Sequence, residues 1–357
     1  MALFRHIKLL LTFGSLALAA ATKAKTANYD EDDDTPLPLI IWHGLGDNFA
    51  ADGLREVGAL AEEVNPGTLV YFAHLGDSAG SDRSATFMGN VTEQVAQVCA
   101  DIAADPILST APALDALGFS QGGQFLRAYV ERCNRPPVRS LVTFGSQHNG
   151  ISEFVECAST DLVCRAAMAL LHGNTWSGFV QGRVVPAQYY RDPSTATAYA
   201  QYLDKSNFLA DINNERPGAR NPQYRDNLAQ LANFAMYLFE NDTTAIPKES
   251  AWFAEVNGTE VTPLRQRALY KEDWLGLKAI DDKGGLHFRT VPGEHMRLRA
   301  EDLQAAFSEF YGPYNKKFPS ASRAPKTTSK SALVLPVPPL PIPALAEEAL
   351  LEALVEL

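Results

Sequence analysis

Short apolar runs alternate with amphipathic stretches in the first part of the chain. The runs at 37–42, 68–73, 114–119 and 140–144 predict buried strands, because they are short and apolar. Apolar residues at helical spacing predict helices between them, at 54–64, 90–104 and 124–130. Strands and helices in this order predict an α/β fold, with a mostly parallel central sheet and helices on both faces.

The alternation stops over about residues 151–231, where helix-like pieces carry many aromatic side chains. This stretch predicts a helical insertion, a lid or cap over the carboxyl edge of the sheet, where α/β proteins bind ligands. Its aromatic residues either line an apolar groove or build the insertion's own core. Runs at 233–239 and 286–291 predict two further strands, and a last helix is expected from about residue 300.

The two ends of the chain differ from the folded domain expected over 37–317. Residues 1–22 have a basic start, an apolar run and small residues at its end, which is typical of a secretory signal peptide. The run is short for a membrane span, so a retained signal anchor is the weaker alternative. An acidic leader follows over 23–36, and residues 318–357 predict a Pro-rich linker with a short amphipathic C-terminal helix.

Composition narrows the classes of function. The chain has 357 residues, of which 46% are hydrophobic and 20% charged, and such a chain can bury a core. The net charge of −11 argues against nucleic acid as a partner, because phosphate binding needs a basic surface. We expect a monomer without a stable membrane span.

Entry into the secretory pathway favours disulfide bonds among the four cysteines. Four cysteines allow three pairings. Cys157 and Cys164 are close enough in sequence to close a small loop, which would leave Cys99 to pair with Cys133. Zinc binding is not expected, because no CxxC motif or nearby histidine pair is present.

Three N-x-S/T sequons also suit the secretory lumen. They make glycosylation candidates of Asn90, Asn241 and Asn257. The sequence leaves open whether the mature protein stays in a lysosome or vacuole or leaves the cell.

The stretch Gly118-Phe119-Ser120-Gln121-Gly122 fits the G-x-S-x-G motif between a predicted strand and a predicted helix. In that motif the serine sits at the tip of a sharp turn and acts as a nucleophile. Glycines suit the turn because a Cβ would meet neighbouring backbone. The alternative is an ordinary strand-to-helix turn that contains a serine, so the motif needs partners elsewhere.

Two later residues supply those partners. Asp242 follows the run at 233–239, and His295 lies in the loop after the run at 286–291. The order serine, acid, histidine, each after a strand, is the one expected of an α/β-hydrolase. Glu240 and Glu249 are the rival acids, but Glu240 still lies in the strand's register and Glu249 is farther along the chain.

A glycine-rich turn at 43–47 follows the first predicted strand. In serine hydrolases with an elbow motif, a His-Gly turn at this place supplies one backbone N–H of the oxyanion hole. His43 itself is predicted to be a structural histidine of the turn.

The chain resembles the palmitoyl-protein thioesterases, lysosomal serine hydrolases, over about residues 38–313. The segments that carry the resemblance are 40–47 (IIWHGLGD), 118–127 (GFSQGGQFLR), 208–213 (FLADIN), 274–278 (WLGLK) and 293–295 (GEH). The resemblance implies removal of palmitate from S-palmitoylated proteins or peptides, with acyl-CoA as a further candidate substrate. It also implies an α/β-hydrolase fold that needs no metal or organic cofactor.

The resemblance further assigns roles to residues of this chain. It makes Ser120 the nucleophile, Asp242 the acid and His295 the base. It implies that oxyanion-hole N–H groups come from Leu45 and Gln121. It also implies two disulfide pairings, Cys99–Cys133 and Cys157–Cys164.

Two other functions fit the same residues. A secreted lipase or carboxylester hydrolase would use the same triad on oxygen esters. A non-catalytic lipid-binding member is the third possibility, and the intact triad argues against it.

Overall fold

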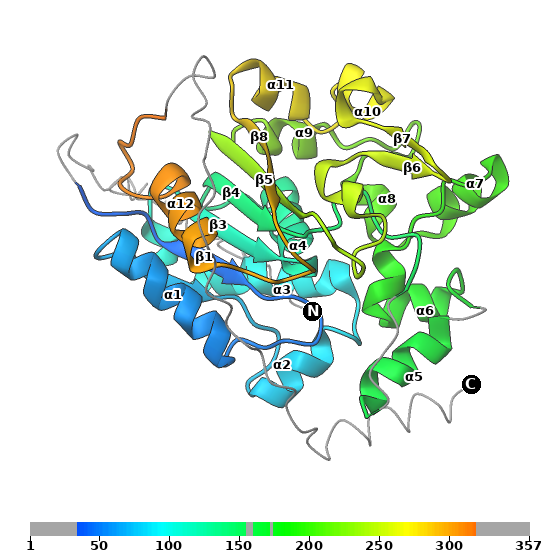
Figure 1. Ribbon diagram of the computed structural model, residues 1–357, viewed down its shortest axis with the longest axis horizontal. Coiled ribbons are helices and arrows are strands. Elements are labelled where there is room, and N and C mark those ends of the chain that lie inside the picture. The colour runs from blue at the N-terminus through cyan, green and yellow to red at the C-terminus, as the bar shows by residue number, and fades with distance from the viewer. Residues whose placement is uncertain (1–33, 155–159, 172–173, 319–357) are drawn as a thin grey trace, which may run out of the picture.

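The computed structural model describes residues 34–154, 160–171 and 174–318 (Figure 1). The predicted signal peptide, most of the acidic leader and all but the first residue of the C-terminal tail lie outside the described residues. Their assignments, and the boundaries of the insertion, stay predictions.

A six-stranded parallel sheet forms the centre of the described chain, in the order β2-β1-β3-β4-β5-β8. The α/β fold predicted from the sequence is therefore confirmed. The strands are β1 (Leu39–Trp42), β2 (Val70–Phe72), β3 (Leu114–Phe119), β4 (Val138–Phe144), β5 (Asn233–Phe239) and β8 (Leu286–Val291).

Helices cover both faces of this sheet (Figure 1). Alternate strand residues point to opposite faces, so Leu39 and Ile41 pack into one apolar cluster while Ile40 and Trp42 pack into another. The first cluster is completed by α1 (Asp52–Val64) and α12 (Ala300–Phe310). The second is completed mainly by α3 (Val91–Ala104), α4 (Gln121–Arg132), α9 (Pro222–Leu228) and α11 (Leu277–Asp282).

The predicted insertion is helical where it is described. Its aromatic residues Tyr189, Tyr202 and Phe208 are buried in the same cluster as α4, so these three build core. The helices of this region before α9 are α5 (Leu162–Leu171), α6 (Gly178–Arg183), the 3-10 helix Val185–Tyr189, α7 (Ala196–Lys205) and α8 (Leu209–Ile212).

Several short elements were not predicted from the apolar pattern. The small antiparallel pair β6 and β7 lies outside the central sheet. A short helix also follows β2 and contacts the turn at 43–47. These elements are α2 (Ala79–Ala85), β6 (Glu255–Asn257), β7 (Glu260–Thr262) and α10 (Ala268–Lys271).

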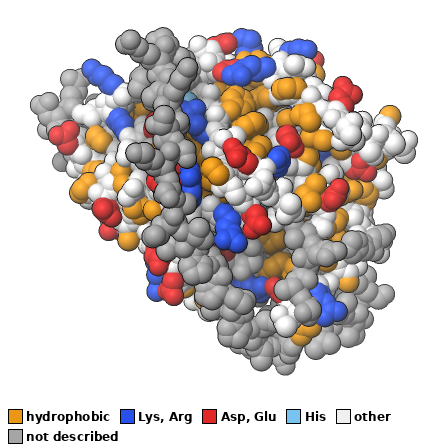
Figure 2. Space-filling model, viewed as in Figure 1, with side chains coloured by type: hydrophobic (Ala, Val, Ile, Leu, Met, Phe, Trp, Pro, Cys, Tyr) orange, Lys and Arg blue, Asp and Glu red, His pale blue; other side chains and the backbone are white. Residues whose placement is uncertain are grey.

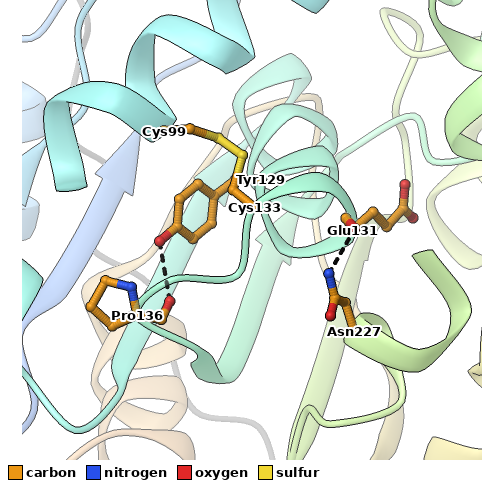
Figure 3. The surroundings of a disulfide bond; sticks show 6 residues. All are labelled: Cys99, Tyr129, Glu131, Cys133, Pro136 and Asn227. Carbon is orange, nitrogen blue, oxygen red and sulfur yellow. Dashed lines mark hydrogen bonds between the residues drawn. A yellow bond between two sulfur atoms is a disulfide. The ribbon is translucent and has the colours of Figure 1, made fainter. Parts of the chain in front are cut away.

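A disulfide joins Cys99 in α3 to Cys133, the residue after α4 (Figure 3). Beside it, the Tyr129 hydroxyl donates a hydrogen bond to the Pro136 carbonyl. This end of α4 is therefore fixed to its neighbours, while its other end carries the serine motif. The second predicted pairing cannot be described, because Cys157 lies outside the described residues.

The three sequons differ in exposure. Asn241 and Asn257 are exposed. Asn90 is half-buried as the N-cap of α3, where its side chain accepts a hydrogen bond from the Thr92 N–H. Glycosylation at these positions stays a prediction.

Charged side chains of both signs are interspersed on the face shown in Figure 2, rather than gathered by sign. Within the described ranges, no helix is long and apolar enough to cross a membrane. The same ranges hold no group of three or more His, Cys, Asp or Glu side chains arranged to hold a metal ion.

His287 gives the fold a sensitivity to acid. Its Nε2 lies 3.1 Å from the Asn233 side-chain oxygen, and its ring packs 4.9 Å from the Phe310 ring. Burial, with the nearby charge of Arg289, lowers the pKa of His287 to about 4. The unfolded chain therefore binds this proton more readily, and stability is lost as the pH falls from 6.5 towards 4.

The variant His287→Gln keeps a donor for Asn233 but cannot take up a proton. We expect the loss of unfolding free energy between pH 7 and pH 4 to shrink by about 2–3 kcal/mol in this variant. Urea unfolding of both proteins at the two pH values measures the difference. Parallel pH dependences for the two proteins would contradict the assignment.

Candidate active site

The predicted elbow lies between β3 and α4. Ser120 adopts a φ of 50°, in a region that a residue with a side chain rarely occupies. Its N–H donates to the Phe144 carbonyl over 2.8 Å, which fixes the turn against β4. The neighbouring glycines are needed sterically, because a Cβ at Gly122 would lie 2.3 Å from the Trp42 carbonyl oxygen. The strained conformation thus puts the serine at the carboxyl edge of the sheet.

The parallel sheet brings the three predicted triad residues together at this edge. His295 Nε2 lies 3.1 Å from Ser120 Oγ, and His295 Nδ1 lies 2.6 Å from Asp242 Oδ2. They come from the ends of β3, β5 and β8, which lie at the same edge because the strands are parallel. The arrangement can pass a proton from the hydroxyl to the imidazole and hold the resulting positive charge beside a carboxylate.

The acid is held firmly in place. Asp242 Oδ1 accepts hydrogen bonds from the N–H groups of Thr244 and Ala245, over 2.8 and 2.9 Å. The Asp242 side chain is only 2% exposed. The rival acid Glu240 is exposed, and Glu249 lies in the 3-10 helix Lys248–Trp252. Only Asp242 among these three carboxylates is paired with the histidine in the described chain.

The predicted oxyanion loop is a tight turn. The Asp47 N–H donates to the Gly44 carbonyl over 3.3 Å, so Leu45 and Gly46 are the central residues. Gly46 has a φ of +80°, as the second central residue of a type II turn requires. The turn packs on the nucleophile, because a Cβ at Gly44 would lie 3.2 Å from Ser120 Cβ.

Leu45 and Gln121, the predicted oxyanion-hole residues, flank Ser120 from the turn and from α4. Neither backbone N–H donates to another residue of the described chain. Both groups are thus free to bind an oxygen atom of a ligand. The Gln121 side chain is held in place, since its Oε1 accepts from the Tyr189 hydroxyl and its Nε2 donates to the Thr86 carbonyl.

His43 has the structural role predicted for it. Its Nε2 donates to Asp82 Oδ2 over 2.8 Å, and both side chains are fully buried. Burial alone would lower the pKa of His43, but the hydrogen bond and charge of Asp82 outweigh it and raise the pKa. Asp82 also accepts from the Phe49 and Leu75 N–H groups. No sequence motif marks Asp82, which lies in a stretch without a predicted element.

Apolar side chains lie next to the oxyanion loop. Leu45 and Met88 pack against a buried cluster built by α5, by α6 with the 3-10 helix that follows it, and by Phe87, two residues after α2. The cluster consists of Phe87, Ala167, Met168, Leu171, Val180, Val184 and Ala187. The surface has a hollow of about 580 Å³ beside α6, lined in part by Phe179, and another of about 300 Å³, and no triad residue lines either one.

Most of the chain is similar in sequence to known proteins. Residues 38–295 match the family described as palmitoyl protein thioesterase. Palmitoyl-protein thioesterase 1 of Caenorhabditis elegans is 37% identical over 287 residues, which cover 79% of this chain and 93% of that protein. Palmitoyl-protein thioesterase 3 of Dictyostelium discoideum is 34% identical over 283 residues, which cover 78% of this chain and 91% of that protein.

A human relative is more distant. Lysosomal thioesterase PPT2 of Homo sapiens is 27% identical over 286 residues, which cover 78% of this chain and 86% of that protein. The family match contains Ser120, Asp242 and His295.

Proposed function

The chain belongs to the palmitoyl-protein thioesterase family, and we propose that it removes palmitate and similar long-chain acyl groups from S-acylated cysteines. Proteins and peptides that carry such cysteines are its proposed substrates, with acyl-CoA as a further one. The observation that supports this mechanism is the hydrogen-bonded series Asp242–His295–Ser120 beside the free N–H groups of Leu45 and Gln121.

The first step forms a tetrahedral intermediate on Ser120. Ser120 Oγ attacks the thioester carbonyl carbon while His295 Nε2 takes the hydroxyl proton. Asp242 holds the imidazole in the tautomer with its proton on Nδ1 and stabilises the imidazolium. The N–H groups of Leu45 and Gln121 bind the oxyanion, and each such donor typically stabilises the transition state by about 3 kcal/mol.

The second half of the reaction releases both products. The carbon–sulfur bond breaks, the cysteine sulfur leaves with the proton from His295, and the acyl group stays on Ser120 as an ester. Water then gives its proton to His295 and attacks this ester. The fatty acid leaves, and the proton returns to Ser120 Oγ.

The apolar cluster beside Leu45 suits a long acyl chain. An acyl carbonyl bound at the Leu45 N–H lies next to the side chain that packs on this cluster. Each methylene removed from water contributes about 0.8 kcal/mol, so a long chain gains more than a short one. We therefore propose that the acyl chain lies against half-buried side chains at the edge of this cluster, those of Leu45, Met88 and Phe179 of α6.

Substrate class separates this proposal from a lipase or carboxylester hydrolase with the same triad. We expect a palmitoyl-cysteine peptide to give a higher kcat/KM than a p-nitrophenyl or glyceride ester of the same acid. Side-by-side rates measure this, and acyl chains of graded length test the apolar surface. Faster turnover of the oxygen esters would favour the lipase alternative.

The proposed cellular site is the lumen of the secretory pathway, in a lysosome or vacuole or outside the cell. It is supported by the predicted signal peptide, by the disulfide between Cys99 and Cys133, and by the name of the human relative. Fractionation of cells that express the full chain tests this placement.

A further inference from the structure

Arg83 of α2 and Thr86, the residue after this helix, hold the oxyanion turn from one side. Arg83 Nε donates to the Gly46 carbonyl over 2.9 Å, and the Gly46 N–H donates to Thr86 Oγ1 over 2.9 Å. Thr86 Oγ1 in turn donates to the Arg83 carbonyl over 2.6 Å. Gly46 is bonded directly to Leu45, so both polar groups of the residue after the oxyanion donor are fixed by this short segment.

The other end of the Arg83 side chain reaches the insertion. Arg83 Nη2 lies 2.6 Å from Asp161 Oδ2, in an ion pair whose side chains are each 23% exposed. Asp161 Oδ1 accepts the Cys164 N–H over 3.1 Å, in the first turn of α5. One guanidinium therefore links the carbonyl of Gly46 to the start of α5.

Arg83 also packs its guanidinium over an aromatic ring. Its guanidinium carbon lies 5.2 Å from the centre of the Phe87 ring. Phe87 belongs to the apolar cluster that includes Ala167 and Met168 of α5, and Leu45 packs on this same cluster. The oxyanion turn and α5 are thus joined twice, by an ion pair and by apolar packing.

With the oxyanion role of Leu45 taken from the proposed function, we propose that Arg83 is a positioning residue for the hydrolysis reaction. It fixes the position of Gly46 relative to α5, and therefore also the position of the Leu45 N–H. An oxyanion donor stabilises the transition state only when it is preorganised within a fraction of an ångström. The same link lets a change in α5, the helix beside the proposed acyl surface, alter the donor's position.

The chain offers a matched control for Arg83. Arg132 at the far end of α4 also makes a partly buried ion pair, with Asp211 over 2.8 Å. Its guanidinium carbon also lies over an aromatic ring, 5.4 Å from the centre of Phe208. Arg132 has no contact with the oxyanion turn in the described chain. Arg132→Met therefore removes the same kinds of interaction without touching the proposed donor.

The experiment measures steady-state rates on a palmitoyl-cysteine peptide and the inactivation rate with a phosphonate that mimics the tetrahedral intermediate. We expect Arg83→Met to lower kcat by about 10-fold to 100-fold with KM changed less than about threefold, because ground-state binding is kept. The inactivation rate should fall by a similar factor. Arg83→Lys, which keeps a donor, should recover part of kcat, and Arg132→Met should keep the wild-type kcat.

The outcomes separate this proposal from the proposed function. If Ser120→Ala abolishes hydrolysis while Arg83→Met keeps the wild-type kcat, the positioning role is wrong and the function stands. If Ser120→Ala leaves hydrolysis intact, the proposed function is wrong, and the positioning role of Arg83 that rests on it is wrong as well. Should Arg83→Met not fold, Asp161→Asn decides: a lower kcat at unchanged KM supports the link to α5, and a wild-type kcat overturns it.

Discussion

The variant Ser120→Ala is expected to lower kcat for a palmitoyl-cysteine peptide by at least about 10⁴-fold. The substitution removes the only atom that can form the acyl-enzyme at the end of β3. Ser120 is 9% exposed and its N–H donates to the Phe144 carbonyl, a bond that alanine keeps. The φ of 50° costs alanine and serine alike, so the fold should be unchanged.

The matched control is Ser146→Ala. Ser146 lies in the loop after β4 and is 1% exposed, and its hydroxyl has no hydrogen-bond partner among the described residues. Its loss should leave kcat within about threefold, because no catalytic hydrogen bond is removed. Steady-state rates and far-ultraviolet circular dichroism on both variants separate loss of the nucleophile from loss of the fold. Hydrolysis by Ser120→Ala above about one part in a hundred would point to another nucleophile.

Most of the central sheet could be predicted from the sequence because its strands are short apolar runs that alternate with amphipathic helices. The candidate triad followed for the same reason, since Ser120, Asp242 and His295 each come after such a run. In a parallel sheet the ends of the strands share one edge, so order along the chain was enough to predict proximity. The structure brings the three side chains within hydrogen-bonding distance there.

Strand boundaries were less predictable. The run at 68–73 forms a strand only over Val70–Phe72, because β2 is an edge strand that pairs with β1 alone. The run at 140–144 begins earlier, at Val138, because Leu114 of β3 pairs with it across an irregular register. The ends of a strand depend on partner strands that are far away in the sequence. The local pattern of apolar residues does not identify these partners.

Contacts around the oxyanion turn were missed for a related reason. Asp82, Arg83 and Thr86 are polar residues in or just after a short helix, and their partners His43, Gly46 and Asp161 lie 37 to 78 positions away. Nothing in a local pattern marks such residues. The β6–β7 hairpin, in contrast, had a usable signal: Gly258 is the first central residue of its two-residue turn, with a φ of 60°, and a glycine there is typical of tight hairpins.

The surroundings of Asp242 make Asp242→Asn a sharp test of the histidine's role. Two backbone N–H groups, from Thr244 and Ala245, donate to Oδ1. An asparagine must keep its oxygen towards these donors, because a turned amide would leave both without an acceptor. Its NH₂ group then faces His295 Nδ1, which lies 2.6 Å from the second carboxylate oxygen in the native protein. The imidazole must accept this hydrogen bond at Nδ1 and carry its proton on Nε2.

That tautomer cannot act as the base. Nε2 lies 3.1 Å from Ser120 Oγ and would donate to the hydroxyl instead of accepting its proton. We expect kcat to fall by about 10⁴-fold with little change in KM, because the substrate's own contacts are untouched. Glu240→Gln, at the exposed rival acid two positions earlier, should keep the wild-type rate. If kcat of Asp242→Asn fell by less than about tenfold, another group would have to orient His295. With the asparagine amide as its only partner at Nδ1, the imidazole would keep its proton on Nε2 and could not accept the Ser120 proton.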